Sequence, residues 1–432
     1  VIFDGVFNHT GRDFFAFKDI QHNRESSQYR DWYCNVNFQG NNEYNDGFSY
    51  DNWGGYNLLV KLNQQNPAVR KYLLDVVKYW VSEFDVDGIR LDAADVLDFG
   101  FMHELRMLAN EIKPEFWLMG EVIHGDYSRW VNSDMLHSVT NYQLYKALYS
   151  GHNEHNYFEI AHTVRYLLDK GNLPYHLYNF VDNHDVERIY TRLLNKHEFV
   201  PVHILMYTLP GIPSIYYGSE FGIEGRKEKH SDAVLRPAIN LEDYPNALDE
   251  NGCTNIIARL GEIRQKNPVF ADGIYQEIRL TNRQYAFSRT NETTQAIVVV
   301  NNDEADSSLE IPANGTYTEV LSGEVQNVNG NLNVYLRACS GQIWIRNYDE
   351  TVAKKKEVKI LETKQAEVKE EIIKQVTVNH SKSYEEMSIE ELQACVLEKL
   401  AKNGPVTEQM KRDVVNNVYY DSLVNWVKSF RN

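Results

Sequence analysis

The sequence has few cysteines, no long apolar run and fewer basic than acidic residues. Its four cysteines, Cys34, Cys253, Cys339 and Cys395, have neither the spacing of a disulfide framework nor that of a metal site, so we expect reduced, buried thiols and no metal centre. No stretch approaches the roughly 18 to 20 apolar residues of a membrane-spanning helix, which predicts a soluble protein without a membrane partner. The 44 basic and 61 acidic residues give a net charge of -17, which disfavours a nucleic acid as partner and suits a neutral ligand.

The composition favours a folded protein with a large core. A chain of 432 residues with 43% hydrophobic residues is long enough for a large domain and a smaller one. Its 28 tyrosines and 7 tryptophans offer flat faces and polar groups to sugars, although most of them would simply pack in the core. Val1 is not a natural start, so the lack of a signal peptide decides little. We predict a cytoplasmic location and leave an extracellular one open.

Three carboxylates stand where short apolar stretches end. Asp92 ends Gly-Ile-Arg-Leu-Asp, Glu121 follows Leu-Met-Gly, and Asp185 ends Phe-Val-Asp-Asn-His-Asp. Gly120 would let the backbone approach closely just before Glu121. Parallel strands that end at one face of a barrel bring such groups together although they lie far apart in sequence. Cleavage of an acetal needs a proton donor for the leaving oxygen and a carboxylate for the cationic sugar carbon. The three positions therefore suggest glycosidic bond chemistry.

Each of these carboxylates has a functional and a structural interpretation. A strand predicted over Val86 to Asp92 places Arg90 and Asp92 on one face, and Ile89 and Leu91 on the other. Arg90 could keep Asp92 ionised as a nucleophile, or form a structural ion pair. Glu121 is the candidate acid, because partial burial and an anionic Asp92 would favour its protonated form, but it could be an ordinary loop carboxylate. Asp185 could support a cationic transition state while His184 donates to a hydroxyl, or the cluster could be a helix N-cap.

A fourth segment opens the chain. The apolar stretch Val1 to Phe7 delivers Asp4, then Asn8 and His9, at the same strand-to-loop position. A neutral His9 could contact a sugar hydroxyl. Asp4 and Asn8 could fix the loop through backbone hydrogen bonds, or serve as ligands for a hard cation such as calcium.

The order and spelling of the four segments closely resemble the signature regions of the α-amylase superfamily, glycoside hydrolase family 13. They read Asp4-Gly-Val-Phe-Asn8-His9, Gly88-Ile-Arg90-Leu-Asp92-Ala-Ala-Asp95, Gly120-Glu121-Val-Ile-His124 and Phe180-Val-Asp-Asn-His184-Asp185. The resemblance implies Asp92 as nucleophile, Glu121 as general acid and base, and Asp185 as transition-state stabiliser. It also implies His9, Arg90 and His184 as sugar contacts, with His124 as a possible further one.

Two further stretches indicate a subgroup. Val60-Lys61-Leu62-Asn63 is similar to the Met-Pro-Lys-Leu-Asn segment of the neopullulanase, cyclomaltodextrinase and maltogenic amylase group, and Gly211 to Glu220 resembles the family's eighth barrel strand. Val60 replaces a proline, and Glu121 to His124 departs from the Glu-Ile-Trp-His of that group. Cyclomaltodextrinase, neopullulanase and plain α-amylase therefore stay open, whereas the core reaction is common to all three.

The pattern of strands and helices predicts an α/β fold with several parts. Residues 1–267 alternate strands and helices as strands 3 to 8 of a (β/α)8 TIM barrel, with an inserted loop subdomain after strand 3 at 10–66. Asn66 is predicted to cap the helix that follows, with Pro67 in its first turn. Residues 268–348 predict an antiparallel β-sandwich with strands at Tyr275 to Leu280, Gln284 to Arg289, Ala296 to Asn301, Ser308 to Ile311, Tyr317 to Leu321 and Gln342 to Arg346. Residues 349–383 predict a charged linker or helix, and 384–432 a small helical tail module in which Ser388 and Glu391 form a capping-box signal. Because a barrel lacking two strands would leave open edges, we expect an amino-terminally truncated fragment of a longer protein.

These observations together predict a retaining glycoside hydrolase. It would cleave α-1,4-glucosidic bonds in starch-derived oligosaccharides or cyclodextrins through a covalent glucosyl-Asp92 intermediate. An α-glucan transglycosylase, in which a sugar replaces water, and a catalytically silent glucan-binding scaffold are the alternatives. The chemistry requires no cofactor, while a structural calcium ion and homo-oligomers are open possibilities.

Overall fold

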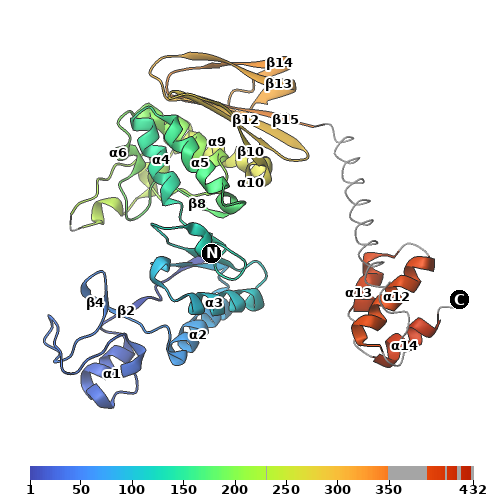
Figure 1. The fold of residues 1–432 in the computed structure, drawn as a ribbon. Helices are drawn as coiled ribbons and strands as arrows, with labels where there is room; N and C mark the ends of the chain where they lie inside the picture. Colours follow the sequence, from blue (N-terminus) through green and yellow to red (C-terminus); the bar gives the residue numbers. More distant parts are fainter. Residues whose placement is uncertain (230, 349–386, 404–405, 416–419, 430–432) are drawn as a thin grey trace. The chain divides into compact units, whose positions relative to one another are not determined.

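A computed structural model gives the structure of the protein and describes residues 1–229, 231–348, 387–403, 406–415 and 420–429. The chain forms two compact units, Val1–Asn347 and Tyr348–Asn432 (Figure 1), and each is considered by itself. The charged linker or helix predicted at 349–383 lies outside the described residues.

Short parallel strands form the centre of the first unit, as expected for strands 3 to 8 of a barrel. They pair in the order β1-β5-β6-β7 and, separately, β8-β9, and a bridge between Thr140 and Tyr178 joins the two groups. Their bounds are β1 (Ile2–Gly5), β5 (Gly88–Leu91), β6 (Trp117–Gly120), β7 (Ser138–Val139), β8 (Tyr178–Asn179) and β9 (Ile212–Pro213). Ile89, Leu91 and Leu118 are fully buried, because helices cover the outer side of a parallel sheet.

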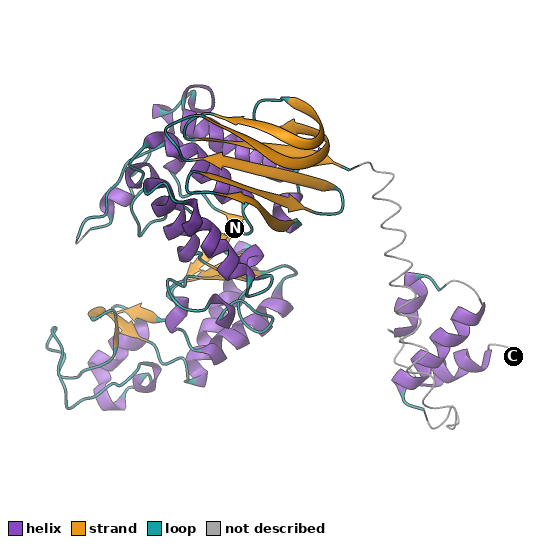
Figure 2. Ribbon diagram, turned by 45° about the horizontal axis from the view of Figure 1, so that its top comes forward, coloured by secondary structure: helices purple, strands orange, loops and turns teal. Residues whose placement is uncertain are grey.

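Helices connect these strands (Figure 2). The longer ones are α2 (Pro67–Phe84), α3 (Phe99–Ile112), α4 (Tyr142–Asn153), α5 (Tyr157–Leu168), α7 (Phe199–Thr208) and α9 (Gly252–Lys266), and the shorter ones α6 (Ile189–Arg192), α8 (Ala247–Glu250) and α10 (Val269–Asp272). Asn66 caps α2 as predicted: its side chain accepts a hydrogen bond from Ala68 N, and Pro67 occupies the first turn.

A small layer interrupts the alternation after β1. It contains α1 (Phe15–Asn23) and a sheet of order β2-β4-β3, formed by β2 (His9–Gly11), β3 (Asn52–Trp53) and β4 (Tyr56–Lys61). Phe17 and Phe48 are fully buried in it. This is the inserted subdomain, although its limits at 10 and 66 stay a prediction.

Six antiparallel strands form the carboxyl-terminal part of the first unit, in the order β10-β11-β12-β15-β13-β14. Their bounds are β10 (Ile274–Leu280), β11 (Gln284–Thr290), β12 (Thr294–Asn301), β13 (Ser307–Glu319), β14 (Val325–Leu336) and β15 (Ser340–Asn347). Along β12, Val298 belongs to the core shared with the barrel helices, whereas its neighbour Val299 belongs to the core under β13 and β14. β12 is therefore buried on both faces, as in the middle of a β-sandwich, whereas β14 alternates buried and exposed residues.

The sequence prediction was wrong about two details of this part. It divided β13 into two strands, Ser308 to Ile311 and Tyr317 to Leu321, and it missed β14. The segment between Val325 and Leu336 is rich in asparagine and contains Gly330, a composition typical of loops. Its pairing with β13 along the whole strand overrides that local preference.

The second unit contains α12 (Ile389–Asn403), α13 (Glu408–Val415) and α14 (Tyr420–Ser429). The predicted capping box is confirmed, because Ser388 N donates to Glu391 Oε2 at 2.8 Å and Glu391 N donates to Ser388 Oγ at 3.2 Å. Leu392, Val396 and Val427 lie in its small apolar core. Its module limits stay a prediction.

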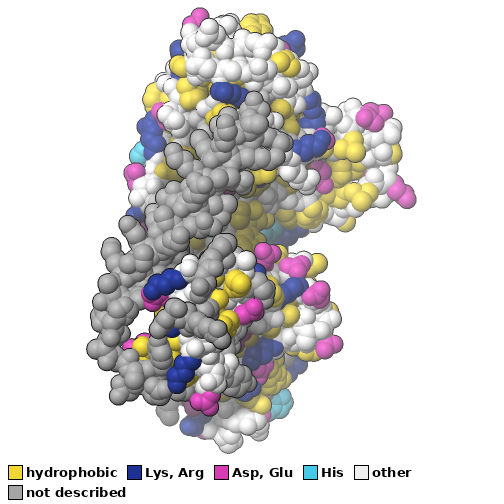
Figure 3. Space-filling model, turned by 90° about the vertical axis from the view of Figure 1, so that its right-hand side faces the viewer, with side chains coloured by type: hydrophobic (Ala, Val, Ile, Leu, Met, Phe, Trp, Pro, Cys, Tyr) yellow, Lys and Arg dark blue, Asp and Glu magenta, His cyan; other side chains and the backbone are white. Residues whose placement is uncertain are grey.

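Basic and acidic side chains are interspersed on the face drawn in Figure 3. Within the described residues, the helices are too short or too polar to pass through a bilayer. All four cysteines are free, but only Cys339 is buried; Cys34, Cys253 and Cys395 are half-buried, so the expectation of burial was wrong for three of them.

Candidate active site

Strand register places the first charged cluster at the carboxyl ends of β1 and β5. Asp4 lies opposite Arg90 in the β1–β5 pairing, and Asp92 follows β5 directly. Alternation along β5 buries Ile89 and Leu91 and leaves Arg90 and Asp92 on the other face. The strand predicted over Val86 to Asp92 is thus shorter than expected, but its predicted sides are confirmed.

Gly120 allows Glu121 to reach the same cluster. A Cβ atom at position 120 would lie 2.5 Å from Leu136 Cδ1 and 2.7 Å from Ala94 Cβ. Only glycine therefore lets β6 pack this closely on its neighbours, and Glu121 follows at the strand end. The close backbone approach that the sequence predicts here is confirmed.

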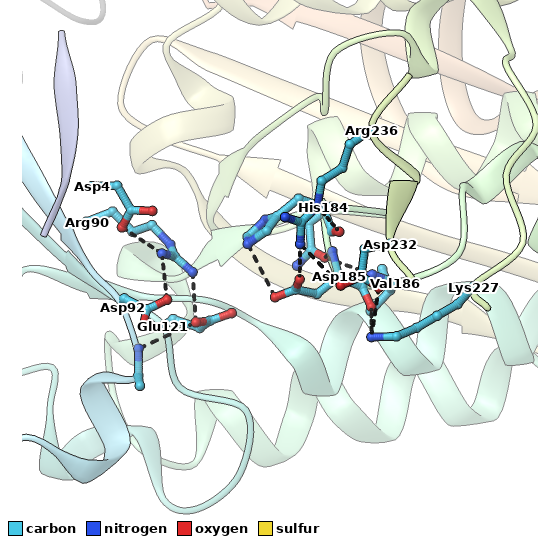
Figure 4. Close-up of polar contacts among 12 residues, drawn as sticks. Asp4, Arg90, Asp92, Glu121, His184, Asp185, Val186, Lys227, Asp232 and Arg236 are labelled. Atoms are coloured by element: carbon cyan, nitrogen blue, oxygen red, sulfur yellow. Dashed lines mark hydrogen bonds and ion pairs between the residues drawn. The ribbon is translucent and has the colours of Figure 1, made fainter. Parts of the chain in front are cut away.

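Arg90 connects the two candidate catalytic carboxylates (Figure 4). Its Nη2 lies 2.7 Å from Glu121 Oε2, and its Nη1 lies 3.2 Å from Asp92 Oδ1 and 2.7 Å from Asp4 Oδ1. Burial lowers the pKa of Arg90, but the charges of Glu121, Asp4 and Asp92 outweigh burial and raise it above its usual value. The guanidinium is therefore a permanent cation between Asp92 and Glu121.

Glu121 is buried, with 8% of its surface exposed. Besides Arg90, its Oε2 faces Ala93 N at 3.5 Å, and its Oε1 accepts a hydrogen bond from Tyr142 OH at 3.4 Å. The sequence analysis predicted an ion pair of Arg90 with Asp92 alone. The structure places the shorter contact of Arg90 at Glu121.

His184 and Asp185 form a second cluster, after β8 (Figure 4). Asp185 Oδ2 lies 3.2 Å from His184 Nε2, and Asp185 Oδ1 lies 2.8 Å from Arg236 Nη2. Lys227 Nζ donates to the backbone oxygen of Asp185 at 2.7 Å. Arg236 and Lys227, from the loop that follows β9, thus contact Oδ1 and the backbone oxygen of Asp185, while the neighbouring His184 contacts Oδ2.

The helix N-cap alternative was wrong, because the N-cap residue of α6 is Arg188 and its side chain forms no capping hydrogen bond. Asp182 Oδ2 accepts hydrogen bonds from Ile189 N at 2.8 Å, where α6 begins, and from Ser219 Oγ at 2.7 Å. Burial raises the pKa of Asp182 to about 6. Asp182 is therefore an internal structural group, and the half-buried Asp185 is the carboxylate that solvent can reach.

Tyr142 and Asn183 join the two clusters. Asn183 Nδ2 donates to Tyr142 OH at 3.0 Å, and Asn183 Oδ1 accepts from Asp185 N at 2.8 Å. With the Tyr142 contact to Glu121, polar contacts run without a break from Asp92 to the backbone of Asp185. The structure therefore gathers all three predicted carboxylates into one network.

The remaining predicted sugar contacts differ in their placement. His9 is half-buried, with Nδ1 3.3 Å from Asn8 Nδ2. Burial lowers the pKa of His9, and the opposing attraction of Asp92 does not outweigh burial, so the ring is neutral near pH 7. His124 is exposed and lies near Asp95, and the structure does not bring it into the network.

Sequence reasoning missed several contacts of the site. Tyr142 begins α4 three residues after β7, a strand-to-helix position that could have drawn attention to it. Arg236 and Lys227 lie more than 40 residues from Asp185 and have no local signal.

Metal binding was an open possibility for Asp4 and Asn8. Asp4 is paired with Arg90, and Asn8 is buried with its side chain against His9. Among residues 1–229, 231–348 and the described parts of the tail, no three His, Cys, Asp or Glu side chains are grouped to hold a metal ion. A structural calcium site stays a prediction.

Two families of known proteins match this chain, and together their matches include all of the site residues described above. The family described as "Alpha amylase, catalytic domain" matches residues 1–244, and "Alpha amylase, C-terminal all-beta domain" matches residues 279–362. The chain belongs to the alpha-amylase family. Members of this family need no cofactor for their chemistry. The resemblance stated from the four segments is thereby confirmed.

Several relatives of this family are similar to the chain. Cyclomaltodextrinase of Thermoanaerobacter pseudethanolicus and neopullulanase 2 of Thermoactinomyces vulgaris are each 31% identical, over 79% of this chain and 59% of their own length. The debranching enzyme of Nostoc punctiforme, solved after an acarbose soak, superposes with a TM-score of 0.67 at 26% identity, over 80% of this chain and 75% of that one. The chain thus spans about 59% of the length of the two curated relatives.

Proposed function

We propose that this chain carries the catalytic residues of a retaining glycoside hydrolase acting on α-1,4-glucosidic bonds. The observation that supports it most is the guanidinium of Arg90, which contacts both Asp92 and Glu121. A retaining enzyme needs its two carboxyl groups close together, roughly 5 to 5.5 Å apart, on either side of the bond that breaks. Because both carboxylates contact one guanidinium, they lie close together, which supports a retaining mechanism.

The proposed reaction has two displacements. In the first, Asp92 attacks the anomeric carbon while Glu121 gives its proton to the departing glycosidic oxygen, which leaves as a free hydroxyl. In the second, the Glu121 carboxylate takes a proton from water, and the water oxygen displaces Asp92 from the sugar. The products are two sugars with net retention, and both carboxyl groups return to their starting states.

The other site residues support the charge that develops on the sugar. Asp185 carries a negative charge toward the oxocarbenium-like transition state, and His184 and the neutral His9 donate hydrogen bonds to hydroxyls. Arg90 contacts the attacking carboxylate of Asp92 through Nη1 and helps to orient it. His124, which is exposed, has the weakest support as a sugar contact.

The substrates that we propose are starch-derived oligosaccharides and cyclodextrins. Support comes from the names of the relatives, cyclomaltodextrinase and neopullulanase 2. The proposed location is the cytoplasm, because all four cysteines are free thiols, as is usual in a reducing compartment. Homo-oligomers stay an open proposal.

Trapping of the covalent intermediate tests this function. The purified protein is given a fluorinated glucosyl fluoride, whose second displacement is slow, and we expect intact-mass spectrometry to find one added sugar and peptide mapping to place it on Asp92. Asp92→Asn should abolish both trapping and the release of reducing ends from maltooligosaccharides. Asp134→Asn, which changes an exposed carboxylate, is the matched control.

Two results would contradict the proposal. One is wild-type turnover by Asp92→Asn, and the other is a product formed with inversion of configuration. Longer oligosaccharides at high substrate concentration would indicate transfer to a sugar acceptor instead of water.

A further inference from the structure

Gln64 is a buried glutamine between β4 and α2, outside the four signature segments. Only 6% of its surface is exposed. Its Nε2 donates to Phe7 O at 2.8 Å, and its Oε1 accepts from Asp98 N at 2.7 Å. The amide nitrogen and the amide oxygen therefore each form a hydrogen bond with a backbone group of another chain segment, 57 and 34 residues away.

These two backbone groups belong to the segments that carry site residues. Phe7 directly precedes Asn8 and His9, after β1. Asp98 ends the turn that begins behind Asp92, and its carboxylate caps α3 by accepting from Phe101 N at 3.0 Å. The Gln64 side chain is thus a direct connection between the His9 loop and the Asp92 turn.

Arg70 fixes this connection from α2. Its Nε donates to the backbone oxygen of Gln64 at 2.5 Å, and its Nη2 contacts Asp98 Oδ1 at 2.7 Å. Leu62 N also donates to Asn8 O at 2.9 Å, beside the Gln64 contact. The glutamine therefore cannot shift without moving α2, α3 and the His9 loop together.

We propose that Gln64 is a positioning residue that sets the separation of His9 and Asp92 at the sugar-binding face. The proposal rests on the proposed function. The side chain at this position must supply one donor and one acceptor, because it faces a carbonyl on one side and an N–H on the other. Glutamate supplies only acceptors when ionised, and methionine has the length of glutamine but neither group. Loss of either bond also leaves a buried backbone group unpaired.

Titration of His9 tests the proposal without any turnover. Nuclear magnetic resonance follows the His9 ring, assigned by its disappearance in His9→Gln. In Gln64→Met the loop is no longer held, so the ring gains water and its pKa should rise toward the usual value. Gln64→Glu keeps the acceptor for Asp98 N and loses the donor to Phe7 O, so it should move His9 in the same direction.

The rate of intermediate trapping is the second readout. If the nucleophile is misplaced, Gln64→Met should lower the rate constant for sugar attachment by about 10- to 100-fold, with the whole sample still trapped at long times. A merely structural role would lower the trapped fraction and leave the rate constant unchanged. Gln65→Met, at the exposed neighbouring glutamine, is the matched control and should match wild type in both readouts.

The outcomes separate this proposal from the proposed function. An unchanged His9 pKa in Gln64→Met would overturn the positioning role, as would an unchanged trapping rate. Failure of the wild-type protein to form any intermediate would count against the proposed function alone, and the His9 titration would still decide the role of Gln64.

Discussion

Arg90 Nη2 lies 2.7 Å from Glu121 Oε2, closer than Arg90 Nη1 lies to Asp92, at 3.2 Å. Arg90, which the sequence pairs with the proposed nucleophile Asp92, thus also contacts the proposed acid Glu121. A planar guanidinium can contact two carboxylates through two nitrogens at once, whereas an ammonium is a single point charge. The arrangement fixes the positions of both carboxylates relative to each other.

Arg90→Lys should therefore damage catalysis even though it keeps the charge. We expect kcat/KM for maltooligosaccharide hydrolysis to fall about 100- to 1000-fold, because one carboxylate loses its partner. Steady-state kinetics measure this, with Arg129→Lys at an exposed arginine as control. Activity within a factor of two of wild type would show that the shared contact does not matter for the reaction.

Glu121→Gln should show a dependence on the leaving group. An amide cannot donate a proton to the glycosidic oxygen, so glycosidic bonds whose leaving group is another sugar should break at least about 100-fold more slowly. Aryl glucosides with acidic phenols need no proton and should keep much more of their first-step rate. A loss that is equal for both kinds of substrate would contradict the acid role of Glu121.

Local patterns determined much of what could be predicted. Alternation along β5 placed Arg90 beside Asp92, and the polar residues after apolar runs marked the strand ends where the site lies. The Asn66 cap and the Ser388 capping box follow from hydrogen bonds within three residues. Such features depend on neighbouring residues alone, and the structure confirms them.

Features that depend on distant partners were not predictable. The contact between Arg236 and Asp185 spans 51 residues, and nothing near Arg236 in the sequence indicates it. The Gln64 amide reaches two segments that only folding brings together. The strand β14 forms because β13 pairs with it, against the loop-like composition of its own residues.

Asn66→Ala tests the N-cap of α2, the helix that carries Arg70. The Asn66 side chain accepts from Ala68 N at 2.8 Å and also donates to Asp31 O at 3.0 Å. Its loss should cost about 1 kcal/mol of stability. Denaturant unfolding measures this cost, and Asn66→Asp, which keeps the accepting oxygen, should be affected less. An equal loss in both variants would show that the contact to Asp31 dominates.

Glu198 is a buried carboxyl group between the barrel helices and the β-sandwich, with 1% of its surface exposed. Within the described part of the chain, no N–H or O–H group donates to either of its carboxyl oxygens, and the Cys339 thiol is the neighbour whose hydrogen bond lowers the pKa of Glu198 against burial. His152 Nε2 lies 4.0 Å away, but burial lowers the pKa of His152 to about 4, so the ring is neutral at pH 7. The nearby Cys339 thiol is also protonated, because burial and Glu198 raise its pKa to about 12.

Burial raises the pKa of Glu198 to about 7, from 4.5, and this predicts a loss of stability with rising pH. Below pH 4.5 the carboxyl is protonated in both the folded and the unfolded protein, so it costs nothing. Between pH 4.5 and 7 only the unfolded chain releases the proton, and the cost grows to about 3 kcal/mol above pH 7.

Glu198→Gln should therefore be more stable than wild type at pH 8 and equal to it at pH 4.5. Thermal unfolding at both pH values measures this, with Glu154→Gln, at an exposed glutamate, as control. A destabilised Glu198→Gln at pH 8 would show that the folded protein holds the ionised carboxylate favourably.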